Sequence, residues 1–374
     1  MGASQFPPAG MNSGKSEVVD VAIIGAGIVG LTIAYRLSKL GKRVLVIEKE
    51  KDPGRGITSG QANVIHVIQL PFGSLKSKLA RKGNAMYDDL SRELGVKLNR
   101  LPSLLVVRGW LRLPILFFVY TYLKLELRGE FKVELMRGRN LRKIEPLLED
   151  GISGGIVVGG YGTVDVGSLV IRLKEAAEAR GAVFSFGNEL SSCRQEGEIT
   201  LLKTGAGDVR ATFVVNAAGL YSDDVARMLG RDLGRLDPGL GVMAVYSGLD
   251  LKAIVAPLPL SIGSRTKGGA MIPATDGTTI IGPTLRVARS KEERGYTDED
   301  LELLRSKFRP LLKKEGKLLR VYTGIRPLSP TRDFIIDFDA SKKVVNLVGI
   351  ESPGLTAAPA IAELVGEMVM GTRA

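Results

Sequence analysis

The sequence predicts an α/β fold with two parts: a parallel sheet covered by helices, and a second, mainly antiparallel β domain. Three observations predict it. Residues 18–48 have the pattern of a strand, a glycine-rich turn, a helix and a strand, while residues 241–288 contain short strands broken by Gly and Pro. Residues 343–370 close the chain with a strand, a loop and a helix. A chain of 374 residues is long for one core and suits two interlocked domains.

A glycine-rich turn joins the first strand to the first helix in the pattern Gly-x-Gly-x-x-Gly. Gly25 permits a tight turn, Gly27 lets the backbone approach a pyrophosphate, and Gly30 lets the helix pack closely on the strand. The N–H groups at the start of the helix, which include those of Ile28 and Val29, favour negative charge. The βαβ unit therefore predicts a Rossmann-like site for the ADP half of a dinucleotide.

An acidic residue ends the second strand of this unit. Glu48 lies 23 residues after Gly25, where a carboxylate accepts hydrogen bonds from ribose hydroxyls. The same negative charge disfavours a 2′-phosphate, so NADP is not expected. Lys49 follows directly and is a further candidate contact to the cofactor.

Hydrophobic periodicity predicts the remaining elements. Residues 168–180 form an amphipathic helix with Val170 and Leu173 on its apolar face, and residues 189–215 alternate as antiparallel strands around a turn at 205–208. We further expect helices over 28–40, 74–95, 140–148, 298–315 and 356–370, and strands over 18–24, 43–48, 103–108, 181–186 and 343–349.

Composition limits the chemistry of the chain. Cys193 is the only cysteine and His66 the only histidine, which excludes an intrachain disulfide, a Cys-based metal cluster and a His-rich metal site. The net charge of +12 fits solvated faces, an anionic substrate, an anionic membrane surface or nucleic acid, and no long basic block chooses among them. Sparse Asn and Gln beside abundant Lys, Arg and Glu are typical of thermophilic proteins.

Four further segments carry a family pattern. They are Thr-Ser at 58–59 with Val-Ile-His at 64–66, Val-Val-Asn-Ala-Ala-Gly-Leu-Tyr-Ser at 214–222, Tyr-Thr-Gly-Ile-Arg-Pro at 322–327, and Val-Gly-Ile-Glu-Ser-Pro-Gly-Leu-Thr at 348–356. With these segments in this order, the chain resembles the FAD-dependent D-amino-acid oxidase and glycerol-3-phosphate dehydrogenase superfamily. The resemblance implies a Rossmann-like, glutathione-reductase-like FAD-binding domain with a second, mainly antiparallel β substrate domain. We expect non-covalent FAD, because Cys193 lies far in sequence from these segments.

The resemblance also implies a division of the chain and a set of cofactor contacts. The FAD-binding domain is expected from 17–80, 151–232 and 328–374, and the substrate domain from 81–150 and 233–327. Contacts to FAD are expected from Thr58, Ser59, Ala218, Gly219, Gly354, Leu355 and Thr356. The last three open the closing helix, whose N-terminus stabilises the charge of reduced flavin. An ordinary helix start with Thr356 as a cap residue is the alternative.

His66 and Arg326 are the catalytic candidates. The resemblance places His66 beside the isoalloxazine, where a neutral imidazole takes a hydroxyl proton while the C2 hydrogen leaves as hydride to flavin N5. Arg326 offers a planar fork that matches a carboxylate. A packing role for His66 and a surface or core-bridging role for Arg326 are the alternatives. Tyr221, Tyr246 and Lys267 are weaker candidates for substrate contact.

The substrate is less well determined by the sequence. Residues 71–78 are similar to a stretch of L-2-hydroxyglutarate dehydrogenases and favour a small anionic 2-hydroxy acid, L-2-hydroxyglutarate- or L-lactate-like. The Gly-Gly-x-Arg-Tyr that follows the loop His in glycerol-3-phosphate dehydrogenases is missing, although residues 269–284 resemble that group. sn-Glycerol-3-phosphate and amines or amino acids remain alternatives. A flavoprotein acting on tRNA and a non-catalytic flavin-binding subunit are alternatives of other classes, and no nucleic acid partner is expected.

Residues 110–125 stand apart from the rest of the chain. Eleven residues without a charge, 113–123, lie between Arg112 and Lys124 and include several aromatics. The run is shorter than the roughly 18–20 residues that span a bilayer, so a cytoplasmic protein is expected. The segment fits a helix in the membrane interface on the inner face of the cell membrane, close to a quinone acceptor. A buried helix of the substrate domain or a homodimer contact is the alternative.

Overall fold

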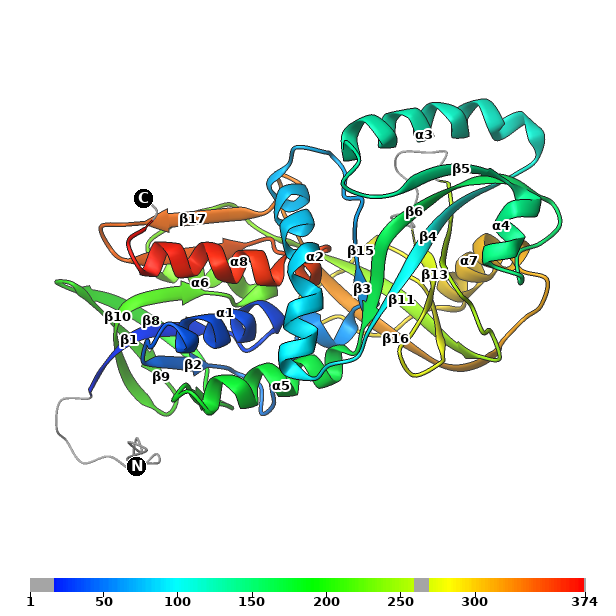
Figure 1. The fold of residues 1–374 in the computed structure, drawn as a ribbon. Coiled ribbons are helices and arrows are strands. Elements are labelled where there is room, and N and C mark those ends of the chain that lie inside the picture. The colour runs from blue at the N-terminus through cyan, green and yellow to red at the C-terminus, as the bar shows by residue number, and fades with distance from the viewer. Residues whose placement is uncertain (1–16, 259–268, 373–374) are drawn as a thin grey trace.

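The computed structural model describes residues 17–258 and 269–372, and two sheets organise them (Figure 1). Helices flank the first sheet, on the left of Figure 1, and the second sheet lies on the right. The helices are α1 (Ile28–Lys39), α2 (Leu75–Leu94), α3 (Leu113–Leu127), α4 (Gly138–Ile144), α5 (Val166–Glu178), α6 (Ser222–Met228), α7 (Asp298–Phe308) and α8 (Gly354–Val369). Short 3₁₀ turns lie at η1 (Ile57–Gly60), η2 (Trp110–Arg112), η3 (Gly219–Tyr221) and η4 (Arg309–Leu311). The predicted fold class is confirmed.

The first sheet has the strand order β17-β18-β10-β1-β2-β7, parallel from β18 to β7, and the β8–β9 hairpin extends from β10. Its strands are β1 (Val18–Ile24), β2 (Val44–Ile47), β7 (Val183–Ser185), β8 (Leu190–Glu196), β9 (Ile199–Thr204), β10 (Gly207–Asn216), β17 (Ile335–Asp339) and β18 (Val344–Val348). β1 lies in the middle of this sheet. Its side chains are covered on both faces, which is why its sequence is a continuous apolar run. Val21 and Ile23 pack with α1, α5 and α8, whereas Ala22 and Ile24 pack with α6 and the hairpin.

The second sheet has the order β15-β11-β14-β13-β12-β4-β6-β3, with β16 paired to β11 and β5 to β6. All these pairs are antiparallel except β12 with β4. Its strands are β3 (Val64–Ile65), β4 (Leu98–Arg108), β5 (Val133–Arg137), β6 (Ile152–Val164), β11 (Asp237–Ser247), β12 (Ile254–Pro257), β13 (Ala270–Pro273), β14 (Thr279–Gly282), β15 (Arg286–Val287) and β16 (Lys317–Leu328). One face packs against α3, and the other packs against α4 and α7.

Two of the expected domain boundaries, at residues 80 and 151, do not coincide with the places where the chain passes from one sheet to the other. β6 pairs with β4 in the second sheet, although the expected boundary at residue 151 assigned it to the FAD-binding domain. α2 packs on α8 and α5 along its length, although the expected boundary at residue 80 divided it. The glycine-rich sequence of β6 carries no clear alternation, so its long pairing with β4 was not visible in the sequence.

Two predicted helices are shorter than expected, and a proline explains each. α4 ends at Ile144 instead of reaching residue 148, because Pro146 disfavours helical geometry at Glu145, which is extended. α7 ends at Phe308 instead of residue 315, and η4 begins with Arg309 and Pro310.

Two close backbone approaches hold the parts together. A Cβ added at Gly60 in η1 would lie 2.5 Å from the Cα of Gly324 in β16, so this contact between the two sheets requires glycine on both sides. A Cβ added at Gly83 in α2 would lie 2.0 Å from the carbonyl oxygen of Thr356, which brings α2 against the start of α8. Both contacts lie close to the predicted site residues.

We expect Gly83→Ala to destabilise the protein by about 1–3 kcal/mol, because the added methyl group forces α2 and α8 apart. Thermal unfolding should show a lower Tm. Gly205→Ala is the matched control, since its nearest neighbour would be 3.7 Å away and its φ is ordinary. Equal Tm values for the two variants would show that the α2–α8 contact tolerates the methyl group.

Candidate active site

The carboxyl edge of the first sheet gathers the glycine-rich turn and the end of β10. Gly25 has a φ of +105°, and a Cβ there would lie 2.5 Å from the carbonyl oxygen of Ala217. The Ala217 N–H donates to the carbonyl of Ile24 at 2.9 Å. Ala218 and Gly219 therefore lie beside the turn, at the edge where doubly wound sheets bind their ligands.

The first turn of α1 has backbone donors to offer an anion. No side chain caps this helix, and the N–H of Ile28 donates to the Thr58 hydroxyl at 3.0 Å. Among the described residues, the N–H groups of Val29 and Gly30 have no acceptor. These groups and the helix dipole fit a pyrophosphate.

Glu48 lies next to this turn. Its carboxylate accepts from the N–H of Ala26 at 2.6 Å and from the N–H of Glu50 at 2.9 Å. Two oxygens with about four acceptor positions leave room for further bonds from ribose hydroxyls. The structure thus places Glu48 where the sequence predicted it.

Three predicted residues of this region have partners within the protein. The Ser59 hydroxyl donates to the carbonyls of Arg55 and Gly56 in its own turn. The ammonium of Lys49 lies 3.6 Å from the ring centroid of Tyr221, whose hydroxyl donates to Glu292 at 2.8 Å. Burial raises the pKa of Tyr221 to about 12, and its bond to Glu292 adds to the shift, so this phenol is a poor base.

The backbone of His66 is held by a hydrogen bond on each side. Its N–H donates to the Thr356 hydroxyl at 3.0 Å, and its carbonyl accepts from the Asn84 side chain at 2.9 Å. The ring contacts Tyr161 edge-on, with centroids 6.2 Å apart. The hydroxyl of Thr356 therefore positions His66. It does not cap α8, in contrast to the alternative in which Thr356 is an ordinary cap residue.

The environment of His66 keeps its imidazole neutral. Burial by surrounding protein lowers its pKa to about 4, and the positive charge of Arg326 contributes to the decrease. At neutral pH the ring therefore has a free nitrogen lone pair that can accept a proton.

Arg326 is half-buried on β16, close to two buried charged side chains. Burial lowers the pKa of its guanidinium, while the nearby Glu351 carboxylate raises it. Glu351 also lies 3.6 Å from the ammonium of Lys76, and both of these side chains are buried. The Lys76 ammonium donates to the carbonyl of Arg332 as well. Two cations thus share one anion beside His66.

Sequence reasoning missed four residues of this site. Asn84 and Tyr161 hold and contact His66, and Lys76 and Glu351 accompany Arg326. Two signals were present in the sequence. Lys76 lies in the stretch 71–78 that was used only for the substrate, and Glu351 directly precedes the Ser-Pro-Gly of the closing loop.

The start of α8 offers a second set of backbone donors. α8 begins at Gly354 without a side-chain cap, and the N–H groups of Leu355 and Thr356 have no acceptor among the described residues. Tyr87 fixes this turn from α2, since its hydroxyl donates to the carbonyl of Leu355 at 2.6 Å. The site thus receives two helix N-termini, from α1 and α8.

Tyr246, one of the weaker substrate candidates, does not join this site. Tyr246 packs with Ala244 on the face of the second sheet that α4 and α7 cover, whereas Met243 and Val245 share the opposite face with Tyr161. The expectation that Tyr246 contacts substrate is therefore not supported. Lys267 lies outside the described residues.

The arrangement fits FAD. Glu48 would hold the ribose, the start of α1 the pyrophosphate and the start of α8 the flavin ring. The amide nitrogen of Gln61, between η1 and β3, is buried and has no partner among the described residues, as expected for a group that meets a ligand. Cys193, on β8, donates its thiol to the carbonyl of Met228, away from these groups.

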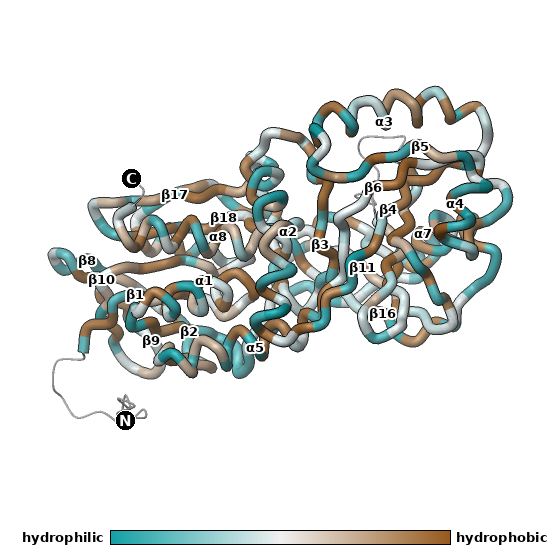
Figure 2. Tube along the Cα trace, in the orientation of Figure 1, coloured by the Kyte–Doolittle hydropathy of each residue, from teal (hydrophilic) through white to brown (hydrophobic). Residues whose placement is uncertain are grey.

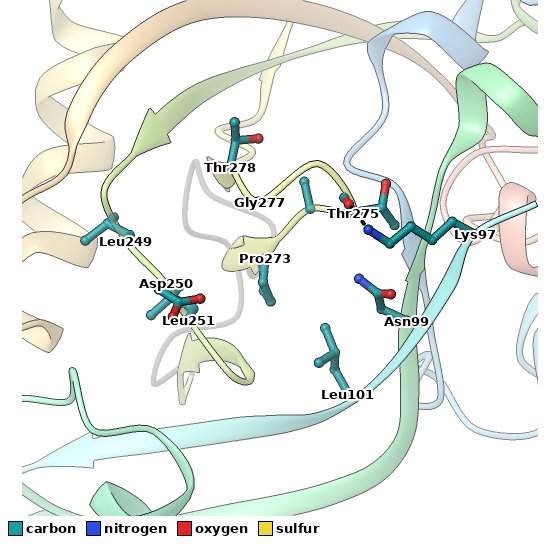
Figure 3. A pocket seen from close by; sticks show the side chains of 11 residues that line it. Lys97, Asn99, Leu101, Leu249, Asp250, Leu251, Pro273, Thr275, Gly277 and Thr278 are labelled. Atoms are coloured by element: carbon teal, nitrogen blue, oxygen red, sulfur yellow. Dashed lines mark hydrogen bonds between the residues drawn. The ribbon is translucent and has the colours of Figure 1, made fainter.

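A separate cavity of about 220 Å³ lies in the second domain (Figure 3). Asn99 of β4 and Lys97, which directly precedes this strand, face the β13–β14 turn across it. The ammonium of Lys97 already donates to the carbonyl of Thr275. None of the candidate site residues lines this cavity.

Comparison with known proteins gives a consistent family. Residues 20–368 match the family described as FAD dependent oxidoreductase. The chain is 30% identical over 349 residues to the glycerol 3-phosphate dehydrogenase of Caloramator mitchellensis, covering 91% of this chain and 72% of that protein. It is 26% identical to the mitochondrial L-2-hydroxyglutarate dehydrogenase of Arabidopsis thaliana, with 93% and 82% covered. A structure of L-alpha-glycerophosphate oxidase from Mycoplasma pneumoniae with FAD bound matches with a TM-score of 0.87 at 24% identity, covering 95% of each chain.

These matches confirm the resemblance inferred from the motifs, the oxidoreductase class and FAD as the cofactor. They include relatives named for two different substrates. The roles of the individual site residues stay predictions, as do the thermophilic origin and the membrane contact.

Replacing Glu48 by Ala should weaken FAD retention, because the ribose loses its acceptor and the N–H groups of Ala26 and Glu50 lose theirs. Glu48→Gln keeps one acceptor oxygen and should weaken retention less. The ratio of flavin to protein absorbance after gel filtration measures the effect. Glu50→Ala is the control, since only its backbone contacts Glu48. Full flavin content in Glu48→Ala would contradict the assignment.

Proposed function

We propose that this chain, which belongs to the family of FAD dependent oxidoreductases, is a dehydrogenase for a small anionic 2-hydroxy acid, L-2-hydroxyglutarate- or L-lactate-like. The electrons pass on to a quinone or another acceptor. FAD, when bound, supplies the acceptor for the hydride that leaves the hydroxyl-bearing carbon. The observation that carries the proposal is a neutral imidazole, His66, under the influence of the guanidinium of Arg326.

His66 acts in the proposal as the general base for the substrate hydroxyl. A neutral ring accepts that proton without first losing its own, and its backbone bonds to Thr356 and Asn84 hold it in place. A substrate carboxylate on Arg326 offsets the guanidinium charge that lowers the pKa of His66. Substrate binding thus raises the basicity of His66 when it is needed.

The charge of the site supports a single carboxylate on Arg326. Lys76 and Arg326 supply two positive charges and Glu351 one negative charge, which leaves one net positive charge. A planar guanidinium binds a carboxylate through two parallel hydrogen bonds. The Lys76 ammonium is already bonded to the carbonyl of Arg332, so Arg326 is the cation left for the substrate.

sn-Glycerol-3-phosphate is the second candidate substrate, because the 30% identical relative is named for it. A phosphate concentrates about two negative charges on one group, whereas L-2-hydroxyglutarate places its two charges on separate carboxylates, one of which Arg326 would bind. Amino acids are a third candidate. A glycine oxidase from Geobacillus kaustophilus matches at 22% identity with a TM-score of 0.84, which establishes a shared fold.

Anaerobic mixing of the yellow protein with separate substrates tests the proposal. L-2-Hydroxyglutarate or L-lactate should bleach the flavin absorbance in a single turnover. Bleaching by sn-glycerol-3-phosphate alone would replace the proposal with the second candidate, and bleaching by L-proline or glycine would indicate an amine substrate. No bleaching by any of them would contradict the proposed substrate class.

Arg326→Ala should weaken substrate binding far more than it alters the flavin spectrum. Losing a charge-assisted bidentate contact costs on the order of 2–4 kcal/mol in kcat/KM. Arg326→Lys should recover only part, since an ammonium has no planar fork. Lys317→Ala, at the exposed start of β16, is the control. Steady-state kinetics with unchanged KM and kcat would remove Arg326 from the site.

His66→Asn should retain FAD and slow flavin reduction by roughly 10²–10⁴-fold. In the wild type at low substrate concentration, where the rate reports the free enzyme, flavin reduction should decrease only as pH falls toward the pKa of about 4, because a protonated imidazole no longer accepts a proton. Arg326→Ala removes a charge that lowers this pKa, so the decrease should begin at a higher pH. Stopped-flow rates across pH measure both effects. A His66→Asn variant that reduces as fast as the wild type would show that His66 is structural.

A further inference from the structure

An apolar surface on η2 and α3 is largely exposed among the described residues, although its Tyr122 contacts Phe72. Eight of the sixteen large apolar side chains that are exposed lie in 110–125. They are Trp110, Leu111, Leu113, Ile115, Phe117, Phe118, Tyr122 and Leu125, here called the α3 face. The helix is the outermost layer over the second sheet, and apolar residues continue along it (Figures 1 and 2).

The buried and exposed sides of α3 are both apolar. Leu116, Leu123 and Leu127 are buried and anchor the helix on β5 and β6. On the outer side, Phe118 is 75% exposed and Leu125 is 70% exposed. A surface helix of a water-soluble domain normally places polar residues there. Such a contiguous apolar patch marks an interaction site.

Basic residues border the α3 face at both ends. Arg108 precedes it and Arg112 lies among its first residues, while Lys124 lies next to its last residue and Arg128 follows it; half-buried Glu126 is the acidic residue within 110–128. All four basic residues are exposed, and none forms an ion pair within the part of the chain that the structure describes. The occupant of this face must therefore be apolar at its centre and anionic at its margins.

The distribution of charge distinguishes a membrane from a second copy of the chain. If two copies paired their α3 helices antiparallel, the Arg112 end would meet the Lys124 end of the other copy. If they paired parallel, each basic end would meet itself. Both arrangements place like charges together and cost energy. An anionic lipid leaflet instead supplies acyl chains for the aromatics and phosphates for the basic residues.

We propose that the α3 face docks this protein on the surface of an anionic lipid bilayer. No helix in the described ranges is long and apolar enough to cross a membrane, so α3 lies in the interface, parallel to the surface. Phe72, in the loop between His66 and α2, contacts Tyr122 of α3 edge-on, with the ring centroids 5.7 Å apart. Docking therefore brings the loop that leads to the candidate base close to the lipid headgroups.

Vesicle binding by the full-length FAD-loaded protein tests the proposal. The protein should co-sediment with vesicles of equal parts phosphatidylglycerol and phosphatidylcholine, and bind less to phosphatidylcholine alone. Trp110 is the only tryptophan and is 74% exposed, so its emission should shift to the blue on binding and be quenched by brominated lipid. The measurement needs no substrate, so its outcome is independent of the proposed dehydrogenase activity.

Phe118→Ser combined with Leu125→Ser should weaken vesicle binding at least about tenfold. Ile171→Ser, on α5 and 54% exposed, is the matched control and should bind as the wild type does. Flavin content and thermal unfolding of both variants verify folding. Arg112→Ser with Lys124→Ser should weaken binding to the anionic vesicles only.

Two outcomes would overturn the proposal. In the first, the wild-type protein does not bind anionic vesicles and its Trp110 emission does not change. In the second, light scattering shows a dimer that the Phe118→Ser, Leu125→Ser variant loses, while vesicles are not bound. The second result would assign the α3 face to a second copy of the chain.

Discussion

The approach of Gly60 to Gly324 is the constraint on which the candidate site depends. Neither position has room for a Cβ, because the backbone of one occupies the space that a side chain on the other needs. This contact joins the loop after the glycine-rich unit to β16, which carries Arg326. It places the loop that leads to His66 beside the strand that carries Arg326, whose charge contributes to the lowered pKa of His66.

Thr356 links the same site to the helices of the first domain. Its hydroxyl accepts the N–H of His66, and its carbonyl contacts Gly83 of α2. Asn84, the next residue of α2, holds the carbonyl of His66. The backbone of the base is therefore held by side chains from two helices, and the imidazole ring takes part in neither bond. The burial that results is also what keeps the ring neutral.

Local patterns predicted the Gly25 turn and the position of Glu48, because both follow short-range rules of turns and strands. The family resemblance, and not a local pattern, assigned the start of α8 to the flavin. Contacts between segments that are distant in the sequence could not be predicted from such local patterns. Lys76 and Glu351 are 275 positions apart and meet only because α2 packs on α8. Tyr246 was misplaced because its side of β11 depends on a pairing that the sequence does not reveal.

The ionisation of His66 tests the central claim most directly. As the only histidine, His66 gives one set of imidazole signals in an NMR titration of the FAD-loaded protein. We predict a neutral ring at neutral pH, with a midpoint near pH 4 that rises in Arg326→Ala. A midpoint at or above the ordinary value of 6.5, unchanged by that substitution, would contradict a neutral base under the influence of Arg326.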